Sequence, residues 1–152
     1  MDANFKIRGL NQLNKELKLL PEDLRNKALN GAVGAAARVL RDEAMRNVPV
    51  DTGNLKGAIR SQKKKTPSKY IGKHQVNIKP RGRVTILTRG RNRRSSSTYY
   101  AKFIEEGSSK TPARPFMRTA FAAKRGDSVK TFQKTLDRRI VLAQKRIKRL
   151  AG

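Results

Sequence analysis

The segment from residue 21 to residue 49 reads PEDLRNKALNGAVGAAARVLRDEAMRNVP. Its apolar residues recur at spacings of three and four, which is the period of one face of an α-helix. Pro21 suits the first turn of a helix, whereas Pro49 cannot continue one, so the two prolines mark the ends of the element. The segment therefore predicts one long helix.

Small residues fill the middle of this helix, where residues 31–37 read GAVGAAA. Each glycine costs about 1 kcal/mol relative to alanine in a helix interior, so the run needs a packing reason. Faces without bulk allow another backbone to approach closely. Two partners are possible, a neighbouring subunit or a sheet of the same chain, and we favour the sheet.

The segments before the long helix predict two short elements. Residues 5–8 read FKIR and alternate apolar with basic side chains, which is typical of a half-buried strand, and Gly9 permits a turn. The next segment predicts a short amphipathic helix that ends before Pro21. Its apolar face consists of Leu10, Leu13, Leu17 and Leu20.

The end of the chain predicts a second long helix, with Asp127 or Ser128 as its N-cap. Its apolar stripe is narrow, like the seam of a coiled coil, so it suits packing on one surface. That surface belongs either to the same subunit or to a neighbour, and we favour the neighbour. The stripe consists of Val129, Phe132, Leu136, Ile140, Ala143, Ile147 and Leu150.

Between the two helices the sequence predicts a small antiparallel sheet and a tight corner. Residues 75–78 and 84–87 are β-prone and flank a basic turn, so we expect them to pair as a hairpin. Residues 49–55 read PVDTGNL, in which Gly53 can adopt a positive φ. The largest aromatic cluster follows later in the chain and is expected to anchor the core; it comprises Tyr99, Tyr100, Phe103 and Ile104.

Together these elements predict an α+β fold, in which a small antiparallel sheet packs against a long helix, with a short N-terminal strand and helix and a long C-terminal helix. We expect residues 1–126 to form a single domain with basic loops at 61–73 and 89–98. Residues 127–152 form the basic C-terminal helix, which is part of the same unit or an interface arm.

The charge is extreme for a chain of 152 residues, with 37 Lys and Arg against 11 Asp and Glu and a net charge of +26. No acidic residue occurs between Asp51 and Glu105, so this interval cannot neutralise itself. We expect a polyanion beside it, either nucleic acid or an acidic protein surface. No helix-turn-helix, zinc-finger or RNA-binding signature is present, so contact with nucleic acid would be to backbone phosphate. The expected contact residues are Lys63, Lys64, Lys65, Arg89, Arg91, Arg93 and Arg94.

Catalytic, metal and membrane functions find little support. The chain has no Cys and one histidine, His74, which we interpret as an ordinary polar residue. No base lies near Ser95, Ser96 and Ser97, and Glu105 and Glu106 are better suited to ion pairs than to catalysis. No apolar run is long enough to cross a bilayer, and the N-terminus lacks a signal peptide, so we expect a soluble protein that is not exported.

Four motifs, in this order, resemble the tail completion (neck) proteins of long-tailed bacteriophages, which are head–tail joining or minor tail components. The motifs are FKIRGL at 5–10, PVDTGNL at 49–55, YYAKFIEEGS at 99–108 and PARPFM at 112–117. The chain departs from the family pattern at Glu106, where an aromatic residue is common, and at Ser108, where threonine is common.

The resemblance implies a virion structural protein with no enzymatic activity and no cofactor, made in the host cytoplasm. It implies a ring, expected to be a hexamer, through which the genome passes at the head–tail junction. Its neighbours there would be head completion or portal proteins and tail terminator or tail-tube proteins. The alternative is a sequence-independent nucleic-acid-binding protein that acts as a free monomer or dimer.

On this resemblance, Glu105 bonds to basic or backbone groups nearby, and Gly53 and Gly107 need a positive φ. The expected motif and subunit-interface residues are Pro49, Val50, Thr52, Gly53, Leu55, Tyr99, Tyr100, Phe103, Glu105, Gly107, Pro115 and Phe116.

Overall fold

The structure is a computed structural model, and it describes residues 10–49, 54–66, 72–79, 84–88, 91–95 and 100–151. The fold is α+β, as the sequence predicts. The predicted strand at residues 5–8 lies outside the described residues. In chain order the elements are α1 (Leu10–Lys18), α2 (Glu22–Asn47), α3 (Asn54–Ala58), β1 (Ile59–Lys63), β2 (His74–Ile78), β3 (Val84–Thr88), β4 (Arg91–Ser95), α4 (Ala101–Glu106) and α5 (Met117–Ala151).

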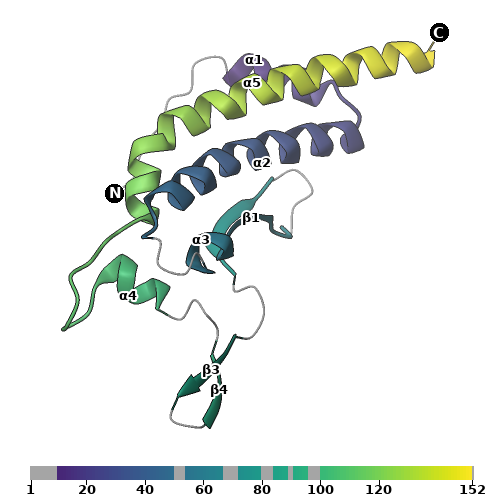
Figure 1. The fold of residues 1–152 in the computed structure, drawn as a ribbon. Coiled ribbons are helices and arrows are strands. Elements are labelled where there is room, and N and C mark those ends of the chain that lie inside the picture. The colour runs from purple at the N-terminus through teal and green to yellow at the C-terminus, as the bar shows by residue number, and fades with distance from the viewer. Residues whose placement is uncertain are drawn as a thin grey trace.

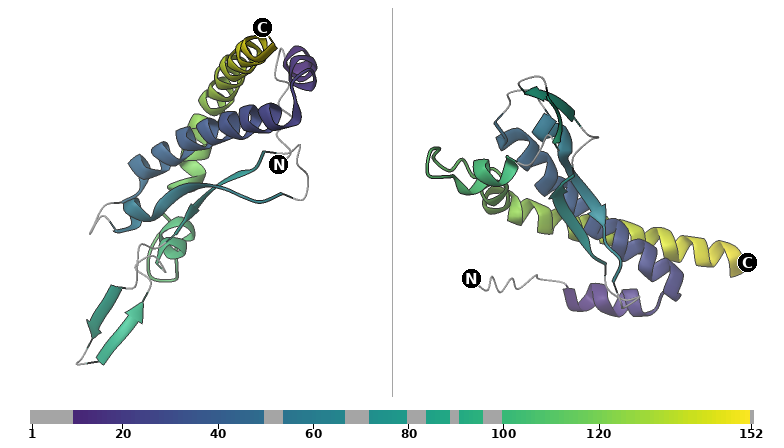
Figure 2. Two further views of the ribbon diagram at one scale, coloured as in Figure 1. Left: turned by 90° about the vertical axis from the view of Figure 1, so that its right-hand side faces the viewer. Right: turned by 90° about the horizontal axis from the view of Figure 1, so that it is seen from below.

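Helix α2 is the central layer of the molecule. Figure 1 shows it between α5 on one side and the strands β1 and β2 on the other. The helix α1 lies alongside α5, and Figure 2 shows the same arrangement from two further directions. The hairpin of β3 and β4 lies at the far end of the molecule from the C-terminus of α5 (Figure 1).

The bounds of α2 match the prediction from its two prolines. Pro21 occupies the N-cap position, and the helix ends where Val48 becomes extended at φ −67° and ψ 130°. The small residues of α2 pack inside the same chain. A Cβ on Gly34 would lie 2.9 Å from Cε1 of His74 in β2, and a Cβ on Gly31 would collide with the guanidinium of Arg139 in α5. Packing against the chain's own sheet is thus confirmed for Gly34, whereas Gly31 faces α5, which the sequence did not indicate as a partner.

The strands pair differently from the prediction. β1 is antiparallel to β2, with Ile59 opposite Ile78, and β3 is antiparallel to β4, with Val84 opposite Ser95. The predicted hairpin between 75–78 and 84–87 is therefore wrong. The partner of residues 75–78 is β1, which enters the core through the buried Ile59. Residues 91–95, predicted as part of a basic loop, form β4.

Helix α5 buries its apolar stripe against the same chain, so the favoured interface with a neighbour is wrong. Leu136 and Ile140 are 1% and 0% exposed, and they share a core with Leu13 and Leu17 of α1. Full burial of such a side chain stabilises the fold by about 1.5–3 kcal/mol. The apolar stripe is covered only where α1 and α2 pack against it. Near the C-terminus of α5 it is uncovered, and Leu150 is 79% exposed.

The start of α5 also differs from the prediction, because the helix begins at Met117 rather than at Asp127 or Ser128. Ser128 is buried within the helix and donates its hydroxyl to the Ala36 carbonyl of α2 at 3.1 Å. Asp127 forms an ion pair with Lys124 at 2.9 Å. Both polar side chains thus have roles other than capping.

Candidate functional site: the corner between α4 and α5

The chain turns sharply between α4 and α5, and we call residues 100–121 the α4–α5 corner. Figure 1 shows α4 below the start of α5, joined to it by an extended loop. A second core lies at this end of the molecule. Its buried members are Ala44, Val48, Leu55, Ile59, Ala101, Phe116 and Ala120.

A single carboxylate joins the two helices of the corner. Glu105 accepts hydrogen bonds from the backbone N–H groups of Phe116 at 2.8 Å and of Met117 and Arg118 at 2.9 Å. The first N–H groups of a helix have no partner within the helix, so Glu105 serves as the cap of α5 although it lies in another helix. The expectation that Glu105 bonds to nearby backbone and basic groups is confirmed.

The electrostatics favour an ionised Glu105. Burial alone would raise the pKa of Glu105, but the three N–H donors and the Arg118 guanidinium together lower it. The guanidinium Nε lies 3.4 Å from the carboxylate, and its Nη2 donates to the Glu105 carbonyl at 2.9 Å. A negative charge at a helix N-terminus also interacts favourably with the helix dipole. The cap is therefore charged at neutral pH.

The loop after α4 is fixed at both ends. Gly107 has φ 81°, as predicted, and its N–H bonds to the Phe103 carbonyl at 2.9 Å. A Cβ at this position would lie 2.9 Å from the nitrogen of Ala113, so a side chain would be strained in both backbone and space. The N–H of Arg114 donates to the Ile104 carbonyl at 2.7 Å, so the end of the loop is bonded back to α4. The exposed loop 108–115 is held in one shape.

The aromatic residues of the corner divide into buried and exposed groups. Phe116 is 1% exposed, and Tyr100 packs partly buried against the same core. Phe103, predicted as a core anchor, lies in the short helix α4 and is instead 50% exposed. Phe121 is 54% exposed and was not anticipated from the sequence. The sequence signal for this exposure was the position of Phe121 directly after Ala120, because Ala120 lies on the buried face of α5 and the next residue points away from that face.

The structure brings three of the sequence motifs, 49–55, 99–108 and 112–117, into one core. Leu55, from the segment 49–55, is 2% exposed and packs with Phe116 in the second core. Pro115 is exposed beside Phe116, and Pro49 is partly exposed next to the buried Val48. The predicted residues Val50, Thr52, Gly53 and Tyr99 lie outside the described residues.

The basic residues predicted to meet a polyanion lie on two different hairpins. Lys63, Lys64 and Lys65 are exposed at the end of the β1–β2 pair, where the Lys64 N–H bonds to the Lys73 carbonyl at 2.9 Å. Arg91, Arg93 and Arg94 lie in β4, and Arg89 is outside the described residues. The strand β1 runs from Ile59 to Lys63, so residues 61–63, predicted as the start of the first basic loop, belong to a strand instead.

His74 has a structural position in β2. Burial, together with the positive charges of Arg38 and Lys63, lowers the pKa of His74. Its Nδ1 is buried and makes no hydrogen bond among the described residues. Within those residues, no three His, Asp or Glu side chains gather closely enough to hold a metal ion. None of the described helices combines the length and apolar character that crossing a membrane requires.

A comparison with protein families matches the chain to the model of bacteriophage HK97-gp10-like tail components over residues 11–107. The chain belongs to this family. The match spans α1 to α4 and ends at Gly107. In this phage tail component Glu105 therefore lies within the matched range, whereas the backbone N–H groups that bond to Glu105 lie beyond its end. No curated protein and no solved structure matches the chain. Family membership makes the chain a structural component of a phage tail.

Proposed function

We propose that the chain is a tail completion protein that assembles into a closed ring, expected to be a hexamer, at the head–tail junction. Its neighbours in the virion are head completion or portal proteins on one side and tail terminator or tail-tube proteins on the other. The role is structural and requires no catalytic step. Family membership supports the broad assignment, and the α4–α5 corner supports ring assembly.

The observation that carries the proposal is a rigid corner with two half-exposed phenylalanines. Phe103 precedes Glu105 by two residues, and Phe121 follows the first turn of α5, which Glu105 caps. About half of the surface of each phenylalanine is exposed to solvent. Large aromatic side chains held on a fixed backbone are typical of the buried centre of a protein interface. A closed ring needs one heterologous interface of constant geometry, and a corner fixed by backbone hydrogen bonds provides it.

The excess of positive charge supports a position close to the genome. The acid-free interval between Asp51 and Glu105 includes β3 and β4, and β4 contains three arginines. Identical subunits in a ring would bring these charges together and raise their mutual repulsion. DNA in the channel offsets that repulsion without base-specific contacts, because phosphates are bound through charge alone.

Ring assembly is tested by the oligomeric state of the purified full chain. We expect native mass spectrometry to show a closed oligomer for the wild type, and Phe103→Ser with Phe121→Ser to shift it to monomer without altering the free energy of unfolding by more than about 1 kcal/mol. Leu150→Ser is the matched control, because Leu150 is more exposed and lies far from the corner. A wild type that stays monomeric at high concentration and in assembled particles would contradict the proposal.

The alternative is a sequence-independent nucleic-acid-binding protein that acts as a monomer or dimer, and the same basic interval favours it. Duplex titrations at several salt concentrations separate the two functions. A free DNA-binding module binds duplex as a monomer or dimer, and its affinity decreases steeply with salt. Replacing Arg91, Arg93 and Arg94 makes that decrease less steep. A ring subunit binds duplex appreciably only after it has assembled.

A further inference from the structure

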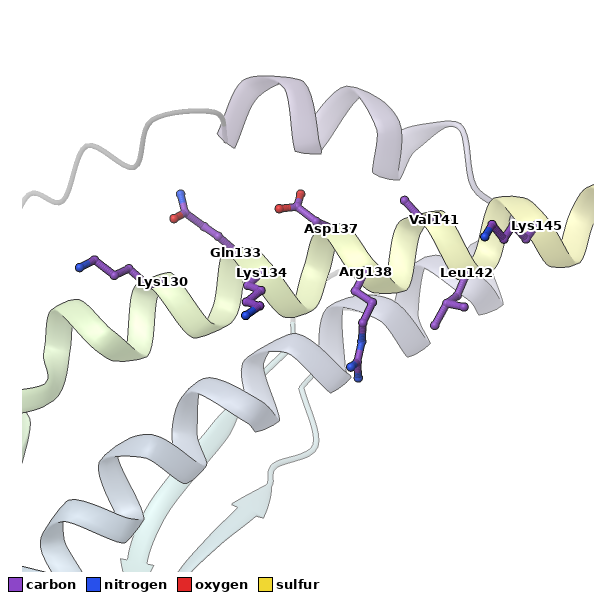
Figure 3. Close-up of a pocket in the computed structure, with 8 residues that line it drawn as sticks. All are labelled: Lys130, Gln133, Lys134, Asp137, Arg138, Val141, Leu142 and Lys145. Carbon is purple, nitrogen blue, oxygen red and sulfur yellow. The ribbon is translucent and has the colours of Figure 1, made fainter.

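The outer face of α5 combines positive charge with exposed aliphatic side chains. A shallow, open groove runs along it, and the described residues that line it all belong to α5. Figure 3 shows the lining side chains on α5, with Val141 pointing toward the side of α1 and Leu142 toward the side of α2. Val141 is 48% exposed and Leu142 is 56% exposed.

The charged residues of this face surround the two aliphatic ones. Lys134, Arg138 and Lys145 are all exposed, and they recur with Val141 every three or four residues on the side of α5 opposite the buried Ile140. No ion pair between described residues neutralises any of these three cations. Among the described residues that line the groove, Asp137 is the only carboxylate.

A second copy of the chain is a poor partner for this face. The same face of another copy carries the same cations, so the two would repel each other. Many of the chain's own carboxylates are also already paired internally. The internal pairs are Asp42 with Arg41, Glu43 with Arg46, Glu105 with Arg118, Glu106 with Lys102, and Asp127 with Lys124.

Nucleic acid accounts for only part of the pattern. Phosphate contacts depend on the cations, and burying Val141 and Leu142 against a phosphate backbone would gain nothing. An acidic amphipathic helix would complement both the cations and the exposed aliphatic side chains of this face. Its apolar stripe would cover the two aliphatic side chains, while its carboxylates would lie beside the flanking lysines and arginine.

We propose that the outer face of α5, from Lys130 to Lys145, is a docking site for an acidic amphipathic helix of another virion protein. The partner presents leucine-like side chains at helical spacing to Val141 and Leu142 and carboxylates to Lys134, Arg138 and Lys145. Asp137 opposes this partner and weakens its binding. The site is separate from the α4–α5 corner, so it can be occupied whether or not the chain forms a ring.

The test uses the full-length chain and two fluorescein-labelled synthetic peptides of the same composition. One has leucines on a single helical face and glutamates elsewhere, and the other has the same residues in scrambled order. We expect the helical peptide to bind at least about tenfold more tightly than the scrambled one. Val141→Ser with Leu142→Ser abolishes that preference, and Lys134→Glu with Arg138→Glu weakens binding of both peptides.

Two single substitutions sharpen the result. Asp137→Asn increases the affinity for the helical peptide because it removes the opposing charge. Leu19→Ser, which changes a leucine that is 80% exposed outside α5, leaves the affinity unchanged. Equal binding of the two peptides, or loss of the preference in Leu19→Ser, overturns the proposal.

Particles provide an independent measurement with the natural partner. A photoreactive residue in place of Leu142 should crosslink to an acidic helical segment of a different virion protein, and Val141→Ser should reduce the yield. Crosslinking to DNA would assign the face to the genome, and crosslinking to a second copy of this chain would assign it to self-assembly. Either of these results contradicts the proposal.

Discussion

Replacing Glu105 by alanine tests how the α4–α5 corner is held together. The substitution removes the acceptor of three N–H groups, those of Phe116, Met117 and Arg118. The N–H groups of Phe116 and Met117 are partly buried, so leaving either one without an acceptor costs about 1–2 kcal/mol of folding free energy. The N–H of Arg118 is exposed, and water can replace its acceptor. We therefore expect the free energy of unfolding to fall by about 2–4 kcal/mol.

Urea denaturation followed by circular dichroism measures this change, and thermal denaturation should show a decrease in Tm of about 5–15 °C. Glu106→Ala is the matched control, because its side chain is 59% exposed and its pair with Lys102 spans 3.7 Å. The control should lose less than about 0.5 kcal/mol. Equal losses for the two adjacent glutamates would refute the capping role of Glu105.

Three further predictions concern the glycine of the corner, the helix seam and the half-buried His74. Gly107→Val should destabilise the chain by about 2 kcal/mol or more, because φ is 81° and the new Cβ meets Ala113, and a Tm within a degree of wild type would be inconsistent with that geometry. Ile140→Ala should lower the free energy of unfolding of the monomer by about 2–5 kcal/mol; a loss confined to the oligomer would place the seam between subunits. The pKa of His74 is lower in the folded chain than its ordinary value of about 6.5, so the unfolded chain takes up the proton first as the pH falls. Stability should therefore decrease as the pH falls below about 6.5 in wild type and less steeply in His74→Gln, and parallel urea midpoints for the two proteins would argue against this.

Helices α1 and α2 and the C-terminal part of α5 were the predictable part of the fold, whereas the short helices α3 and α4 were not predicted. The leucines of α1 and the stripe of α5 have helical spacing, and the two prolines delimit α2, so local sequence determines these elements. The stripe of α5 could not reveal its partner, because the same spacing serves a neighbour's helix or the chain's own α1 and α2. Only the packing of Leu136 and Ile140 against α1 decides between them.

The strand pairing and the start of α5 depend on contacts between distant residues. Residues 75–78 have a β pattern, but pairing with β1 requires Ile59 to lie in the second core, and no local signal in IRSQK indicates that. The cap of α5 comes from Glu105, outside the helix, so the usual N-cap pattern near the first turn is absent. Asp127 and Ser128 resembled a helix start for that reason.

The site was predicted in part. Glu105, Gly107 and Phe116 lie where the motifs placed them, since their roles depend on short loops. The exposure of Phe103 and Phe121 could not be read from residue type, because phenylalanine is more often buried. The groove on α5 went unrecognised because its aliphatic residues are separated by charges in the sequence.

The central claim is that this tail component forms a ring at the head–tail junction through its α4–α5 corner. A cryo-electron microscopy map of the assembled particle, at a resolution that shows side chains, tests it directly. The account predicts a closed ring of this chain between head and tail, with Phe103 and Phe121 buried against the next copy. A map that places the chain elsewhere in the virion, or leaves both phenylalanines in solvent within the ring, would contradict it.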